Sequence, residues 1–236
     1  MTTNSSGPAA NTSVHRNLLN HGAVMGDVAG WQVPLRFSGP DTEVDACKKH
    51  VGMAEQSHVT KLRLQGPGVP AALEKLGATP PVGGVADVLF TSERSRLDIE
   101  LARLAEVEAW ITAPPEIQSK LRSASGGLID NGAVFDLTSS FSAVRLVGPK
   151  AALVVTSLTD LDLRPTHMPD RSCAQTTLAE VYGLVIRADI GDLPSYRLFF
   201  GREYGIYVWE SLVEAGEGYG MDLIGTEALA ALVAAG

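Results

Sequence analysis

The sequence predicts an α+β fold made of two related halves, each combining a sheet with helices. The main observation is a recurrence. The run Leu62-Arg63-Leu64-Gln65-Gly66-Pro67, followed by a helical pattern, returns 82 residues later (position 62 to position 144) as Val144-Arg145-Leu146-Val147-Gly148-Pro149. A period this long that occurs twice indicates two halves of one domain rather than a repeat array. Connections of irregular length and strands that follow one another as local hairpins favour α+β over a doubly wound sheet.

Composition and charge limit the classes of partner. With 236 residues, 45% of them apolar, the chain has enough material for a large buried core. A formal net charge of −8 with scattered Lys and Arg argues against nucleic acid, whose phosphates need a clustered positive surface. No apolar run approaches the roughly 18 to 20 residues that span a bilayer, and the N-terminus lacks both a basic region and an apolar signal core. We therefore expect a cytoplasmic protein without a membrane partner.

The two cysteines, Cys47 and Cys173, are too few for a disulfide framework, and we predict no metal site from them. Both are expected to be reduced thiols. Cys47 falls on the apolar side of a predicted helix, where a small buried side chain is the expected role.

The folded region is predicted to follow a disordered tail. Residues 1–14 are rich in Ser, Thr, Asn and Pro, so they bury too little apolar surface to offset the entropy of ordering. The folded region is then 15–236, with halves at about 42–127 and 128–236. Apolar spacing and turn residues predict the elements of the first half. They are a helix at 42–51, a strand at 59–64, a helix after Gly66-Pro67, strands at 97–101 and about 106–112, and a helix after Pro114-Pro115.

The second half repeats this order. A strand is predicted at 142–147, followed by the Gly148-Pro149 turn and a helix, then strands near 178–188 and 195–200. A further helix is expected to stop at Gly216. The two Gly-Pro turns should occupy equivalent places, and a ligand should lodge between the halves. The Ala-rich run at 228–235 predicts an exposed apolar patch.

Six short runs, in order along the chain, carry a family resemblance. They are 25–34 (MGDVAGWQVP), 51–53 (VGM), 57–58 (SH), 64–67 (LQGP), 146–151 (LVGPKA) and 206–216 (IYVWESLVEAG). Together they resemble the glycine cleavage T-protein family, which includes aminomethyltransferases and tetrahydrofolate-linked demethylases. The resemblance implies the T-protein folate-binding fold, with tetrahydrofolate as cofactor. Family members continue into a C-terminal β-barrel, which we expect this chain to lack because it stops just after Ala228-Leu229. In that respect it also resembles the gamma subunit of heteromeric sarcosine oxidase.

The same resemblance implies the site residues. The family's catalytic aspartate lies in a Gly-Gly-x-x-Asp-Asp element, which corresponds here to 92–98 (SERSRLD) without the glycines, so Asp98 is the candidate by position. The family's Tyr-Thr-Gly-Glu-Asp-Gly element, whose glutamate recognises the pterin, corresponds to 199–204 (FFGREY). Glu203 matches that glutamate when the alignment shifts by one residue, with Arg202 beside it. His58, at the start of the first central strand, is a further candidate for contact with the ligand.

Each candidate also has a purely structural explanation. Asp98 and Glu100 share one face of an alternating strand, as solvent-facing charges do. Glu203 beside Arg202 at a turn fits a solvated charge pair. His58 fits a ring bonded to the backbone at the start of a strand.

The function implied is transfer of a methyl or aminomethyl group to tetrahydrofolate. In that chemistry Glu203 would orient the pterin edge, and Asp98 would stabilise positive charge at the reacting amine and steer its proton. The chain would be a subunit of a heteromeric demethylase or aminomethyltransferase-like enzyme, acting on a methylated small molecule beside a barrel-containing or oxidoreductase chain. The alternatives are a non-catalytic assembly subunit of an oxidase complex and a folate-binding module.

Overall fold

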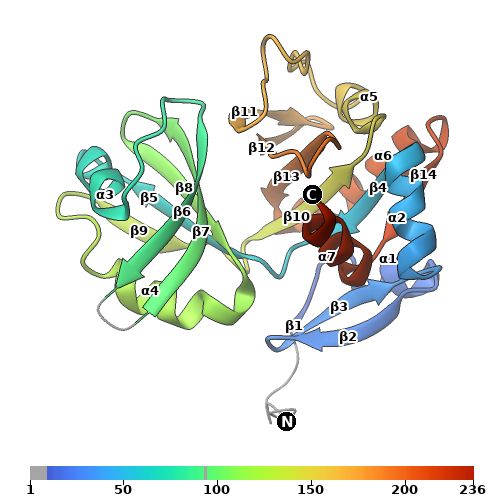
Figure 1. Ribbon diagram of the computed structural model, residues 1–236, viewed down its shortest axis with the longest axis horizontal. Helices are drawn as coiled ribbons and strands as arrows, with labels where there is room; N and C mark the ends of the chain where they lie inside the picture. The colour runs from blue at the N-terminus through green and yellow to red at the C-terminus, as the bar shows by residue number, and fades with distance from the viewer. Residues whose placement is uncertain (1–9, 93–94) are drawn as a thin grey trace.

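The computed structural model describes residues 10–92 and 95–236, which form two sheet-based lobes (Figure 1). The five-stranded lobe has the sheet order β6-β7-β8-β5-β9, and the six-stranded lobe has the order β11-β12-β13-β10-β4-β14. A smaller three-stranded sheet, β1-β3-β2, lies beside the six-stranded lobe. None of these sheets closes into a barrel within the described ranges. The mixture of sheets and helices confirms the predicted α+β class.

Each lobe combines its sheet with helices. The five-stranded lobe contains β5 (Thr60–Gln65), α3 (Val69–Leu76), β6 (Val85–Ser92), β7 (Ser95–Ala105), β8 (Glu108–Ala113), the 3-10 turn η1 (Pro115–Ile117), α4 (Gln118–Ser125) and β9 (Ala133–Asp136). The strands of the six-stranded lobe are β4 (Val51–Glu55), β10 (Phe141–Val147), β11 (Ser172–Leu178), β12 (Val181–Arg187), β13 (Ser195–Gly201) and β14 (Met221–Ile224). Around it lie α1 (His15–Asn20), α2 (Pro40–Lys49), α5 (Ala151–Thr156), the 3-10 turn η2 (Arg202–Tyr204), α6 (Gly205–Glu217) and α7 (Thr226–Ala235). The small sheet consists of β1 (Ala10–Asn11), β2 (Val24–Val28) and β3 (Trp31–Arg36).

The chain crosses between the two lobes twice. Strand β4 pairs with β10 and β14 in the six-stranded sheet, and the next strand, β5, joins the five-stranded sheet. Later, β9 pairs with β5, and the next strand, β10, returns to the six-stranded sheet. The predicted halves at about 42–127 and 128–236 therefore do not coincide with the lobes, because each half places one strand in the sheet that holds most of the other half.

The two Gly-Pro turns are equivalent, as the recurrence predicted. Gly66 and Gly148 have φ angles of +127° and +132°, which side chains rarely adopt, and α3 and α5 follow these turns. Each glycine also lies against the backbone of a neighbouring segment. A Cβ on Gly66 would lie 2.6 Å from Gly132 Cα, and one on Gly148 would lie 2.4 Å from the Cys47 carbonyl oxygen.

Helices cover the outer face of each sheet, and a third core joins the lobes. In the five-stranded lobe, α3 and α4 pack on alternating apolar residues such as Leu97, Ile99 and Leu101 of β7. In the six-stranded lobe, α5 and α6 cover the opposite face from the one that meets the other lobe. Between the lobes, Trp110 of β8 packs on Phe199 of β13, with ring centroids 5.8 Å apart. The inner faces of the two sheets are therefore held in contact by apolar side chains.

Two predictions about the ends of the described region need correction. Strand β1 pairs with β3, and Val14 is buried, so the packed part of the chain begins at Ala10 rather than after residue 14. Residues 1–9 of the predicted tail lie outside the described residues. The Ala-rich run forms α7, which buries Ala228, Leu229 and Leu232 against α2 and β14 and exposes the other five residues of 228–235, so the predicted apolar patch is wrong only for the buried side of this helix.

The sequence pattern also missed several strands. Strand β6 pairs along its length with β7, and β11 with β12, yet neither was predicted as a separate element. Both are outer strands of their sheets, and their inner faces carry polar residues. The alternation that identifies a strand is nevertheless weak, because β6 contains the apolar run Val88-Leu89-Phe90 and β11 carries polar residues on both of its faces.

Candidate functional site

Two hydroxyl side chains hold the crossing strands together in the same way. At the first crossing, Ser57 Oγ accepts a hydrogen bond from the Ala143 amide of β10 at 3.0 Å. At the second crossing, Thr138 Oγ1 accepts one from the Lys61 amide of β5 at 3.1 Å. In each clamp, the acid two positions before the hydroxyl residue accepts that residue's backbone amide. The duplication is therefore visible in hydrogen bonds as well as in the Gly-Pro turns.

The first crossing contains three buried ionisable side chains: Glu55, His58 and Lys61. Burial raises the pKa of Glu55 to about 7, although bonds from Ser57 act against it. Burial also lowers the pKa of Lys61 to about 7, and the Lys61 ammonium donates to the carbonyl oxygens of Ser57 and Val59, both at 2.8 Å. His58 has its pKa lowered to about 4 by burial and by Lys61, so its ring is neutral at neutral pH. This cluster is called the crossing cluster below.

The structure brings two predicted site residues to this cluster. His58 is 6% exposed, and its Nδ1 atom has no hydrogen-bond partner among the described residues. Arg202, in η2 directly after β13, donates from its guanidinium to the Asn11 carbonyl oxygen at 2.7 Å. Its positive charge also lowers the pKa of both Glu55 and Lys61, although as a lesser cause. His58 and Arg202 therefore belong to one electrostatic environment.

The other two predicted residues are exposed. Asp98 lies on β7 opposite Leu89 of β6, on the face that is turned toward the six-stranded lobe. Glu203 lies in η2, immediately before α6. Across the described ranges, no ion pair or hydrogen bond joins either carboxylate to another side chain. Residues 93–94, part of the element that identified Asp98, lie outside the described residues.

A cavity of about 310 Å³ lies between the lobes; the sequence predicted a ligand site between the two halves, but none of the predicted site residues lines this cavity. Its walls include Arg145 of β10 and Arg197 of β13 from one lobe, Glu100 of β7 from the other, and Arg171 from the segment before β11. Glu100 and Asp98 share the inner face of β7, two residues apart, so the cavity opens on the same face as Asp98. One of its lining residues, Arg145, could have been singled out from the sequence, because the recurrence places it at the position equivalent to Arg63.

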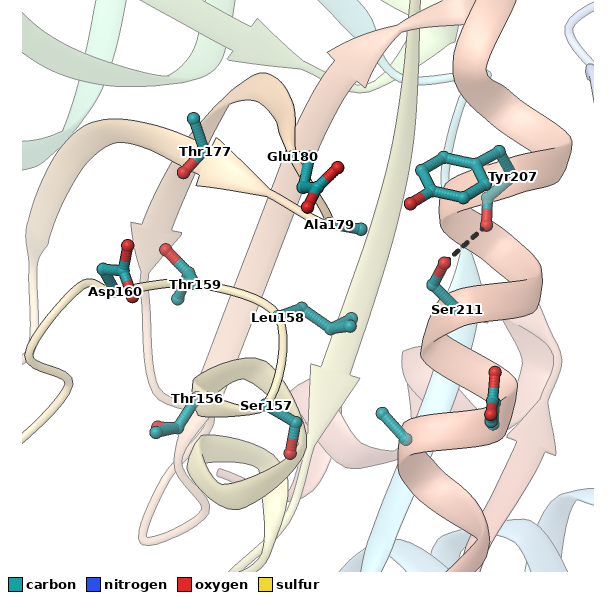
Figure 2. Close-up of a pocket in the computed structure, with 12 residues that line it drawn as sticks. Thr156, Ser157, Leu158, Thr159, Asp160, Thr177, Ala179, Glu180, Tyr207 and Ser211 are labelled. Carbon is teal, nitrogen blue, oxygen red and sulfur yellow. Dashed lines mark hydrogen bonds between the residues drawn. The ribbon is translucent and has the colours of Figure 1, made fainter.

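A second hollow, of about 610 Å³, lies on the outer side of the six-stranded lobe (Figure 2). Tyr207 and Ser211 of α6 face the β11–β12 turn at Ala179 and Glu180 across it. Its lining includes three carboxylates but no Lys, Arg or His side chain. None of the predicted site residues lines it. An anionic ligand such as folate is therefore a poor match for this hollow.

Comparison with known proteins identifies the family. The chain belongs to the family of the GCVT N-terminal domain, whose model matches residues 14–234. It is 26% identical to an aminomethyltransferase of Streptomyces coelicolor, over 89% of this chain and 57% of that protein. The resemblance to the T-protein family found in the sequence is thereby confirmed. The chain spans less than two thirds of the length of this relative.

Solved structures share the fold. The glycine cleavage system aminomethyltransferase T of Bartonella henselae matches with a TM-score of 0.80 and 20% identity, over 94% of this chain and 61% of that chain. A chain of the heterotetrameric sarcosine oxidase of Corynebacterium sp. U-96 matches with a TM-score of 0.58 and 22% identity, over 77% of this chain and 92% of that chain. The T-protein-like fold is therefore confirmed. In the described part of the chain, no helix is both long and apolar enough to cross a bilayer.

Proposed function

We propose that this chain provides the folate-facing part of a tetrahydrofolate-linked system that transfers a methyl or aminomethyl group from a methylated small molecule. In this proposal it acts as one subunit in the cytoplasm, beside a barrel-containing or oxidoreductase chain. Membership of the family and the aminomethyltransferase relative support the chemistry. The observation that carries the proposal is Asp98, a carboxylate exposed on the inner face of β7, to which the sequence resemblance assigns the place of the family's catalytic aspartate.

Two exposed carboxylates, Glu203 and Asp98, support a role for tetrahydrofolate in this proposal. The pterin edge offers N–H donors, and the exposed Glu203 carboxylate is a charged acceptor for them. Tetrahydrofolate, when bound, supplies the nitrogen that takes up the one-carbon unit. Asp98 would hold positive charge at the reacting amine and accept its proton. His58 is neutral, and its Nδ1 atom has no hydrogen-bond partner in the described part of the chain, so it would bind the ligand by a hydrogen bond rather than by charge. Arg202 would orient the backbone around η2.

Calorimetric titration with tetrahydrofolate, alone and with a co-purified partner chain, tests this proposal. Glu203→Gln removes a charged acceptor and should cost about 1.5–3 kcal/mol of binding, or roughly 10- to 150-fold in Kd. Asp98→Asn should leave Kd nearly unchanged and slow turnover in the complete complex. Glu217→Gln, near the other end of α6, and Asp41→Asn in α2 are exposed controls that should change neither. If the wild-type chain binds no tetrahydrofolate with or without its partner, the proposal is wrong.

A second candidate is a non-catalytic subunit that holds an oxidase complex together. The match to 92% of a chain of a heterotetrameric sarcosine oxidase supports it, because that chain belongs to an assembly. Under this alternative, the Asp98→Asn and Glu203→Gln variants would still co-purify with an oxidoreductase chain. The complex would not bind tetrahydrofolate, and its assembly would not depend on tetrahydrofolate. Sedimentation of the co-expressed chains, with and without tetrahydrofolate, separates the two functions.

A further inference from the structure

The cavity between the lobes contains two arginines in an unfavourable arrangement. Arg145 of β10 and Arg197 of β13 are directly opposite each other in the antiparallel pair, so both side chains emerge on the inner face. Like charges directly opposite in a sheet destabilise it unless other charges compensate them. Burial, and then Arg197, lower the pKa of Arg145 to about 9, which leaves its guanidinium charged at neutral pH. The site therefore needs negative charge beside both arginines.

The carboxylates of the cavity are engaged by other arginines. Glu100 pairs with Arg197 and with Arg171, which also pairs with Asp87. Asp189 pairs with Arg187 through both carboxylate oxygens, at 3.1 and 2.9 Å.

Arg145 differs from these neighbours. Its Nε donates to Ser195 Oγ at 2.7 Å, and one terminal nitrogen donates to the Ala188 carbonyl oxygen at 2.9 Å. Both acceptors are neutral. Within residues 10–92 and 95–236, no carboxylate forms an ion pair with Arg145. Among the described residues, Arg145 is therefore the arginine of this cavity with only neutral hydrogen-bond partners, although Glu100 and Asp189 lie close enough to raise its pKa.

In the first copy of the duplicated unit, the arginine at the position equivalent to Arg145 has a carboxylate partner. Arg63 of β5 is the equivalent of Arg145, 82 residues earlier (position 63 to position 145). Arg63 Nε forms an ion pair with Glu108 Oε1 of the adjacent strand β8 at 2.9 Å. Glu108 lies opposite Gln65, and the corresponding position in the second copy, opposite Val147, is Ser195, which accepts from Arg145 Nε without carrying a charge. The second copy thus keeps the arginine and lacks its carboxylate, beside a cavity.

We propose that this cavity binds a small carboxylate, whose oxygens pair with Arg145. A planar guanidinium matches a carboxylate with two parallel hydrogen bonds. A volume of about 310 Å³ is at the lower end of the range for small-molecule sites, so the ligand is compact. The site favours a carboxylate over phosphate, because a dianion would face one unmatched cation and the nearby carboxylates of Glu100, Asp87 and Asp189.

This inference rests on the charges of the cavity and not on folate chemistry. Its test uses short carboxylates rather than folate, so the two proposals fail separately. Acetate, glutarate, glycine and inorganic phosphate are titrated into the full chain by calorimetry at constant ionic strength, with chloride as the reference anion. We expect at least one carboxylate to bind with a Kd of about 0.1–1 mM, as ligands of few atoms do.

Two variants and one control locate the site. Arg145→Gln should weaken carboxylate binding about tenfold or more, because it removes the charge. Arg145→Lys should lie in between, since it keeps the charge but not the paired donors. Arg36→Gln, an exposed arginine that pairs with Glu227, should bind like the wild type. Glycine binding more tightly than acetate would identify the ligand as an amino acid, whose ammonium group meets the acids of the cavity.

A second measurement covers the case in which Arg145→Gln does not fold. The Nε–H resonance of Arg145 in the wild-type chain should shift on titration with the carboxylate that binds, while that of Arg36 stays in place. No binding beyond chloride by any carboxylate would overturn the proposal. So would equal affinity in Arg145→Gln, tighter binding of phosphate, or an unmoved Arg145 resonance.

Discussion

The turn at Gly148 is the sharpest test of the duplicated fold. Its φ of +132° alone should cost a side chain about 1–3 kcal/mol. A Cβ there would also lie 2.4 Å from the Cys47 carbonyl oxygen and 2.6 Å from that of His50. Because both are backbone atoms at the junction of α2 and β4, the junction itself has to move. We expect Gly148→Ala to lower the free energy of unfolding by about 3–5 kcal/mol in total, in the upper range of point substitutions.

Gly77→Ala is the matched control for this prediction. Gly77 ends α3 with a φ of +91°, yet no atom of the described residues lies within 4 Å of the position that its Cβ would take. Its substitution should cost only the conformational part, about 1–2 kcal/mol. Urea unfolding followed by far-UV circular dichroism gives both values. A Cβ on Gly66 would lie 2.6 Å from Gly132 Cα, so Gly66→Ala should lower the free energy of unfolding by about as much as Gly148→Ala. Equal losses in Gly77→Ala and Gly148→Ala would refute the argument that close backbone contact explains the glycine.

Three further predictions concern buried polar groups. Ser57→Ala and Thr138→Val should each lower the free energy of unfolding by about 1–3 kcal/mol in urea titrations, because each leaves a strand amide without its acceptor; losses below about 0.5 kcal/mol would contradict the clamp. Lys61 has a folded pKa of about 7, below its ordinary value of 10.5, so the unfolded chain binds more protons between these values and stability should rise with pH there. Lys61→Met should flatten this rise in unfolding free energies measured from pH 7 to 10, and an unchanged slope would exclude Lys61 as its source. Burial raises the pKa of Cys47 and Cys173 to about 12, so iodoacetamide at pH 8 should label them only after unfolding, as mass spectrometry would show; rapid labelling of the native chain would contradict their burial.

The pH range chosen for Lys61 avoids two opposing contributions. Burial raises the pKa of Glu55 from 4.5 to about 7, so its share of stability falls as pH rises through that range. Burial lowers the pKa of His58 from 6.5 to about 4, so its share rises over nearly the same range. These two slopes have opposite signs and partly cancel below pH 6.5. Above pH 7 the Lys61 slope stands largely alone within the crossing cluster.

The sequence by itself determined the features that local chemistry controls. The recurrence located the Gly66 and Gly148 turns, because only glycine suits their positive φ and close backbone contact. Alternation located β5, β7 and β10, and ordered motifs indicated the family. Each of these features can be recognised from residues close together in the chain or from the comparison of two copies of one pattern. Asp98 also came from the sequence, but its exposure on the inner face of β7 came from the packing of the sheets.

Only the tertiary structure decided which strands share a sheet. The exchange of β4 and β9 between lobes depends on hydrogen bonds between residues far apart in the chain, such as the one from the Ala143 amide to Ser57. The same distance hid which residues line the cavity, because Arg145 and Glu100 come from different lobes. A charge in a sequence does not show whether an opposite charge will reach it. In the fold, Arg63 has Glu108 beside it and Arg145 faces Arg197, since pairing is set by strand register and not by position along the chain.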